Sequence, residues 1–122
     1  MQNKEVGKVF DLVERTSLFG EKIITFSQKI PKTVVTLPLI NQLVKAGTSI
    51  GANYCEADCA ESRNDYIHKV GICKKEARET EYWLRMIALT VNNESIKELS
   101  SEAKQLRLIF VSLINKSKQN QN

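Results

Sequence analysis

Residues 42–61 read QLVKAGTSIGANYCEADCAE, a helix-length stretch with almost no solvent-facing side. At about 100° per residue its apolar positions fall on one stripe, which is typical of a helix packed in a core. That stripe consists of Leu43, Gly47, Ile50, Tyr54 and Ala57. Small residues follow one flank at Gly51, Cys55 and Cys59, and polar residues follow the other at Ser49, Asn53 and Glu56.

Charge in this stretch is confined to Lys45, Glu56, Asp58 and Glu61. A helix with so little charge on its outer face is normally surrounded, and a chain of 122 residues is too short to surround it alone. We therefore predict that this helix is shared between a bundle core and a contact with another subunit.

Amphipathic periodicity predicts four helices, over residues 6–30, 38–61, 63–91 and 96–117, and a disordered tail over 118–122. Pro31 ends the first helix, and Pro38 suits the first turn of the second. Ser62 and Asp65 form a capping-box pattern at the start of the third helix, and Ser95 is the expected cap of the fourth. The segment KTVVT (32–36) is interpreted as an extended loop that covers one end of the bundle.

These four helices have short connections, which force neighbouring helices to run antiparallel. The predicted fold is therefore all-α, a single domain over residues 1–122 with an antiparallel up-down-up-down four-helix bundle. Small residues are expected to let helix axes approach closely. They are Gly47, Gly51, Cys55 and Cys59 in the second helix, and Cys73 and Ala77 in the third.

Composition is that of an ordinary globular protein, with 42% apolar and 26% charged residues. No stretch approaches the ~20 apolar residues of a membrane span, and the N-terminus MQNKEVGKVF lacks the apolar run of a signal peptide. Three cysteines are an odd number without a secretory context, which favours reduced thiols. A cytoplasmic protein is predicted.

Side chains that carry catalytic chemistry are scarce. The surroundings of His68, YIHKVGI, resemble the histidine phosphotransfer pattern only loosely, because Gly71 stands where a lysine is required and Ile72 follows it. A carboxylate-bridged di-metal site needs two Glu-x-x-His pairs, and the chain has one histidine. We therefore expect no enzymatic activity, no metal and no cofactor.

Trp83 lies at the border of the apolar stripe of the third helix, on the same side as Glu76 and Glu79. A lone tryptophan in that position is either the edge of a core or an interface anchor, since tryptophan is enriched at contact hot spots. Together with the weakly charged second helix, it favours an interface.

The two central helices, QLVKAGTSIGANYCEADCAESRNDYIHKVGICKKEARETEYWLRMI, resemble the family called four-helix bundle proteins or 23S rRNA intervening-sequence proteins. Matching positions are Gln42, Leu43, Ser49, Ile50, Asn53, Glu56, Ala57, Ser62, Lys75, Glu76, Glu79, Thr80, Trp83 and Leu84. The family pattern before the fourth helix is replaced here by VNNES, and Tyr54 replaces the commoner aliphatic residue.

This resemblance implies a bacterial protein that assembles into a ring-shaped homopentamer and has no attached catalytic activity. If the polar side chains shared with the family are buried, they must hydrogen-bond to one another or to a loop backbone, so we predict that the set forms a structural polar network or subunit interface. The set comprises Ser49, Asn53, Glu56, Ser62, Glu76, Glu79 and Trp83.

Two functions from different classes remain open. One is a scaffold that docks a protein partner on the ring face or on the Trp83 surface. The other is weakly sequence-selective binding of RNA, because a net charge of +4 reaches roughly +20 in five copies. The expected nucleic-acid contacts are Lys69, Lys74, Lys75, Arg78, Arg85, Lys97, Lys104 and Arg107.

Overall fold

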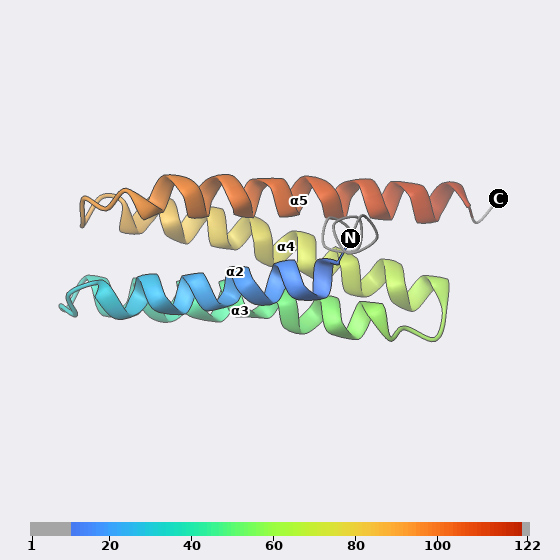
Figure 1. Ribbon diagram of the computed structural model, residues 1–122, viewed down its shortest axis with the longest axis horizontal. Helices are drawn as coiled ribbons and strands as arrows, with labels where there is room; N and C mark the ends of the chain where they lie inside the picture. Colours follow the sequence, from blue (N-terminus) through green and yellow to red (C-terminus); the bar gives the residue numbers. More distant parts are fainter. Residues whose placement is uncertain (1–10, 121–122) are drawn as a thin grey trace, which may run out of the picture.

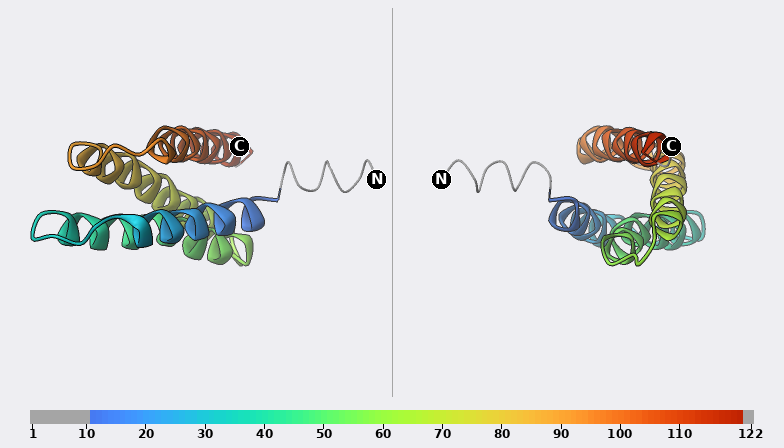
Figure 2. Two further views of the ribbon diagram at one scale, coloured as in Figure 1. Left: turned by 60° about the vertical axis from the view of Figure 1, so that its left-hand side comes forward. Right: turned by 90° about the vertical axis from the view of Figure 1, so that its right-hand side faces the viewer.

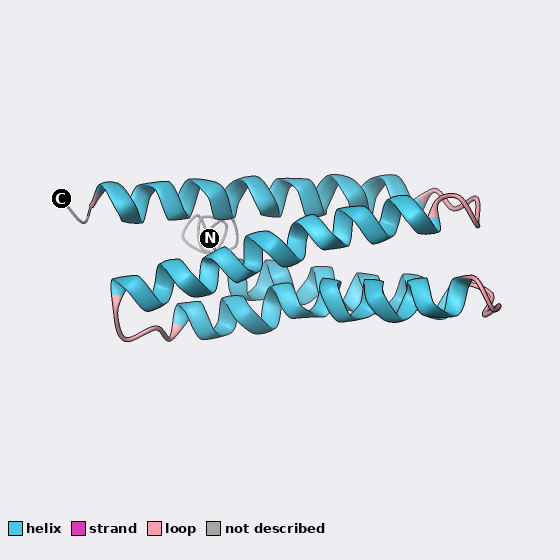
Figure 3. Cartoon of the chain, turned by 180° about the vertical axis from the view of Figure 1, so that it is seen from behind, coloured by secondary structure: helices cyan, strands magenta, loops and turns pink. Residues whose placement is uncertain are grey.

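A computed structural model describes residues 11–120, most of which lie in four α-helices. These are α2 (Leu12–Lys29), α3 (Thr36–Asp58), α4 (Arg63–Ile87) and α5 (Ser95–Gln119). Consecutive helices run antiparallel, with the α2–α3 and α4–α5 loops at one end and the α3–α4 loop at the other (Figures 1 and 3). The predicted all-α, up-down-up-down bundle in a single domain is confirmed.

The four helices follow a curve when seen along the bundle (Figure 2, right). Each described helix packs extensively against the next one in sequence, whereas α2 and α5 pack against each other only slightly. The inner faces supply the core, as the periodicity predicts. Its largest fully buried side chains are Phe19, Ile23, Leu43, Ile50, Leu84, Ile87, Leu106 and Phe110.

Helix α2 begins at Leu12, after Asp11, whose carboxylate accepts a hydrogen bond from Glu14 N at 3.1 Å. The predicted start near residue 6 lies outside the described residues. The helix ends at Lys29 because Ile30 takes an extended conformation before Pro31.

Helix α3 begins at Thr36, earlier than predicted, because Thr33 and Thr36 cap it reciprocally. Thr33 Oγ1 accepts a hydrogen bond from Thr36 N at 3.0 Å, and Thr36 Oγ1 accepts one from Thr33 N at 2.8 Å. The predicted loop is present over residues 32–35, but it does not cover the bundle end, since Val34 is 94% and Val35 61% exposed. The helix ends at Asp58 rather than at residue 61.

Helix α4 begins as predicted, with Ser62 Oγ accepting from Asp65 N at 3.0 Å. It ends at Ile87, four residues before the predicted end. There Thr90 donates to the Ile87 carbonyl through both its amide (2.9 Å) and its hydroxyl (2.8 Å). Satisfying a terminal carbonyl in this way closes the last turn.

Helix α5 is capped by Asn93, whose Oδ1 accepts from Ser95 N at 2.8 Å. The prediction of Ser95 as the cap is therefore wrong, because Ser95 is already the first helical residue. The predicted disordered tail is also wrong in part, since the helix continues through Lys118 and Gln119. Residues 121–122 lie outside the described residues.

Glycines bring α2 and α3 close together. A Cβ on Gly47 would lie 2.9 Å from Ile23 Cγ1, and one on Gly51 would lie 3.3 Å from the Thr16 carbonyl oxygen. These two glycines are therefore points of close approach between α2 and α3. Cys55 and Cys59, by contrast, are exposed in this chain.

Candidate interaction surfaces

The polar flank of α3 bonds mainly to its own helix. Ser49 Oγ donates to the Lys45 carbonyl at 2.6 Å, and Asn53 Nδ2 donates to the Ser49 carbonyl at 2.9 Å. Within the chain, these two side chains therefore do not form the predicted network between helices. The link from this flank to α4 is an ion pair, Lys69 Nζ to Glu56 Oε1 at 2.7 Å, and this hydrogen bond raises the pKa of Lys69.

Glu76, Glu79 and Trp83 form a half-buried band on one side of α4. In the described part of the chain, neither carboxylate makes a hydrogen bond or an ion pair, and the buried Trp83 Nε1 has no acceptor. Burial raises the pKa of the Glu76 carboxyl and the nearby Glu79 charge raises it further, while the charges of Lys75 and Lys45 offset part of this rise. Unpartnered polar groups in a half-buried band are typical of a surface that another molecule completes.

Replacing Glu76 by glutamine tests this band. Because the pKa of Glu76 is raised in the folded chain, its ionised form opposes folding at neutral pH, and the opposition disappears below the unfolded pKa of about 4.3. We expect Glu76→Gln to raise the free energy of unfolding at pH 7 by less than about 1 kcal/mol, and not at pH 3.5. Urea denaturation at both pH values measures this.

The control is Glu21→Gln on the exposed side of α2, for which we expect no change beyond about 0.5 kcal/mol. A loss of stability in Glu76→Gln at pH 7 would show instead that a cation partners this carboxylate.

The outer face of α2 and α3 is a second surface. On α3 it is a stripe at helical spacing that contains one charge, on Lys45. Its members are Asn41, Lys45, Thr48, Ala52, Cys55 and Cys59, all exposed except for the half-buried Thr48. On α2, Gly20 lies against the Thr48 backbone, and Ile24, one turn further, is 41% exposed. We call this surface the α2–α3 face.

Cys73 and His68 are candidates for a nucleophile and a metal ligand. Cys73 is fully buried and donates to the Ile50 carbonyl at an Sγ–O distance of 3.6 Å, and burial raises its thiol pKa to about 12. A protonated, inaccessible thiol is not a nucleophile. His68 is exposed on α4, and no three histidine, cysteine or acidic side chains gather around a metal-sized space within residues 11–120.

Basic side chains gather between α4 and α5, where a pocket of about 380 Å³ is lined by Lys74, Lys75, Arg78, Glu79, Arg107 and Val111. Arg107 is fixed by Glu81, with Nε and Nη2 donating to the carboxylate at 2.6 and 3.3 Å. Arg85 and Lys104 are exposed on the same two helices. The other predicted contacts lie elsewhere: Lys69 pairs with Glu56 of α3, and Lys97 lines the space between α2 and α5.

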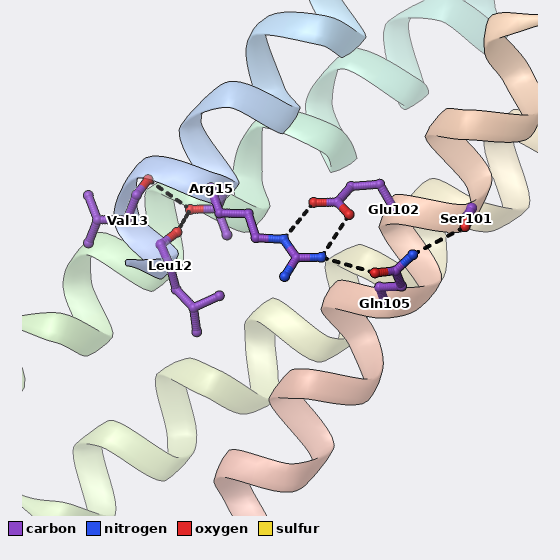
Figure 4. Close-up of polar contacts among 7 residues, drawn as sticks. Leu12, Val13, Arg15, Ser101, Glu102 and Gln105 are labelled. Atoms are coloured by element: carbon purple, nitrogen blue, oxygen red, sulfur yellow. Dashed lines mark hydrogen bonds and ion pairs between the residues drawn. The ribbon is translucent and has the colours of Figure 1, made fainter. Parts of the chain in front are cut away.

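That space is a groove of about 940 Å³ between α2 and α5, with Phe19, Phe26 and Leu99 in its lining. Beside this groove, Arg15 of α2 bonds to two residues of α5 (Figure 4). Its Nε and Nη2 donate to the Glu102 carboxylate, both at 2.8 Å, and Nη2 also donates to Gln105 Oε1 at 3.2 Å. Sequence reasoning missed this contact because 87 residues separate Arg15 from Glu102.

The model of the 23S rRNA-intervening sequence protein family matches residues 8–112. The chain belongs to that family. Among solved structures, this family member is similar to a protein of unknown function from the S23 ribosomal protein family of Bacteroides thetaiotaomicron, at 33% identity and a TM-score of 0.73. The similarity covers 84% of this chain and 97% of that one.

No curated protein matches this family member. None of its described helices has both the length and the apolar character needed to cross a lipid bilayer.

Proposed function

We propose that this chain is a non-enzymatic scaffold that assembles into a homo-oligomer, a pentameric ring, and docks a protein partner. The observation that carries the proposal is the α2–α3 face. It is solvent-exposed in one chain, yet α3 presents small side chains there with a single charge. Small side chains let a second helix approach closely, and Ile24 adds exposed apolar area beside them.

The half-buried band on α4 supports the docking part of the proposal. Trp83 supplies a large half-buried ring, and Glu76 and Glu79 supply two carboxylates that make no ion pair within the described residues. A polypeptide that carries a lysine or arginine complements this band in charge.

Oligomeric state tests the assembly. We expect sedimentation equilibrium at micromolar concentration to give a mass of five times the 13.8 kDa of one chain. Ala52→Arg, which places a charge in the middle of the α2–α3 face, is expected to dissociate the oligomer, because an unpaired buried charge is costly.

The matched control is Ser112→Arg, the same added charge at an exposed site on α5, which should leave the mass unchanged. A single-chain species in the unmodified protein, or an Ala52→Arg variant with undiminished mass, would overturn the assembly.

Nucleic-acid association is a second candidate function, favoured by the basic cluster between α4 and α5. Binding through phosphates releases counterions and therefore weakens steeply with salt. If the chain binds nucleic acid in this way, its affinity for RNA decreases when the salt concentration is raised from about 50 to about 200 mM.

A further inference from the structure

The outward face of α4 carries an aromatic ring among cations. Arg78, Tyr82 and Arg85 are all exposed and are spaced i, i+4 and i+7, so they lie on one side of the helix. At 1.5 Å per residue, Tyr82 is about 6 Å along the axis from Arg78 and about 5 Å from Arg85. Lys74 and Lys75 extend the same face by one turn.

Arg107 extends this positive surface onto α5. Its bonds to Glu81 use Nε and Nη2, which leaves the N–H groups of Nη1 for another acceptor. Because the ion pair fixes the guanidinium, an anion that binds there does not have to immobilise a flexible side chain. The pocket that Arg107 shares with Lys74, Lys75 and Arg78 contains one acidic residue, Glu79.

Tyr82 has a ring that is both accessible and held in place. It is 51% exposed, and it contacts the Trp83 ring edge to face, with centroids 4.9 Å apart and an interplanar angle of 78°. Proteins that bind single-stranded nucleic acid combine such a ring, on which a base stacks, with cations that follow the backbone. A paired base inside a duplex has no free face to offer to the ring.

We propose that this surface of α4, completed by Arg107, binds single-stranded nucleic acid. Lys74, Arg78 and Arg107 contact the phosphates, and Tyr82 stacks on an unpaired base. This inference rests on the second candidate function, and it adds the form of the nucleic acid and the residue that selects it.

Fluorescence anisotropy distinguishes preferential binding of single strands from nucleic-acid association in general. The probes are a labelled, unstructured RNA of about 20 nucleotides and the same strand annealed to its complement, each titrated at about 50 and about 200 mM salt. We expect the single strand to bind about tenfold more tightly than the duplex at both salt concentrations. Equal or tighter binding of the duplex would overturn this inference while nucleic-acid association stood, and binding of neither probe would remove both.

Variants test the stacking. Tyr82→Leu is expected to weaken single-strand binding roughly 5- to 100-fold and to leave duplex binding unchanged, whereas Tyr82→Phe, which keeps the ring, should bind like the unmodified protein. Arg78→Gln should weaken binding of both probes and reduce the salt slope by about 0.7 for the single strand. Lys22→Gln, which removes an equal charge from α2, is the control and should stay within about twofold.

Circular dichroism is the check that each variant is folded. The inference fails when Tyr82→Leu binds the single strand as tightly as the unmodified protein, or when Tyr82→Phe is as weak as Tyr82→Leu. Vesicles that contain phosphatidylserine offer the same phosphate chemistry without a base. If they compete with the single strand for the unmodified protein as strongly as excess RNA does, the assignment to nucleic acid is overturned.

Discussion

A Gly47→Leu variant is expected to lose about 3 kcal/mol or more of folding free energy. A Cβ at this position already lies 2.9 Å from Ile23 Cγ1 and 3.0 Å from Ile23 Cγ2, and the Ile23 side chain is fully buried. A leucine adds three further carbons, so α2 and α3 must separate. For a chain of this size we expect the melting temperature to fall by roughly 10 °C or more.

An alanine at position 47 distinguishes the effect of helix propensity from the effect of steric overlap with Ile23. Gly47→Ala gains about 1 kcal/mol of helix propensity, but its Cβ overlaps Ile23, so we expect a net loss of about 1 kcal/mol. The control is Gly71→Ala in α4, where a Cβ meets nothing within 4 Å and the same propensity should stabilise the fold by about 0.5–1 kcal/mol. Equal stabilisation in both alanine variants would contradict the close packing of α2 on α3.

A Phe110→Ala variant is expected to lose about 3–5 kcal/mol, a large part of the stability of a domain this size. Phe110 is fully buried on α5, and its ring centroid lies 6.1 Å from that of Tyr54 on α3. Its removal leaves a cavity at the centre of the core, which the rigid helices fill only in part. Thermal and urea denaturation measure the loss.

Leu108→Ala is the matched control two residues away, because Leu108 is 50% exposed. Its expected cost is less than about 1 kcal/mol. Similar losses in the two variants would mean that Phe110 is not the centre of the core that its burial indicates.

Both variants affect the apolar stripe of α3, because Gly47 belongs to it and Phe110 contacts its Tyr54. The residues that it assigns to the core, Leu43, Gly47, Ile50, Tyr54 and Ala57, are all buried. Helix ends were harder to predict. The caps of α3 and α5 come from Thr33 and Asn93, which precede the periodic residues, and no apolar pattern marks such hydrogen bonds.

The candidate surfaces were predicted only in part. Periodicity correctly places Glu76, Glu79 and Trp83 on one half-buried side of α4. It does not show that Ser49 and Asn53 bond to their own helix, or that Lys69 is engaged by Glu56. Short polar side chains in a helix often find a carbonyl one turn back, and this local bond competes with bonds to a neighbouring helix.

For residues 11–120, local sequence was therefore enough for the four helices, their antiparallel order and their buried sides, because the 3.6-residue period places each side chain around its own helix axis. Tertiary structure alone decided what lies beside each outward face. It joined Arg15 to Glu102, left a groove between α2 and α5, and brought Arg107 to the cations of α4. Where neighbouring axes pass depends on how the whole core packs, and Gly47 and Gly51 determine part of that packing by letting α2 approach α3.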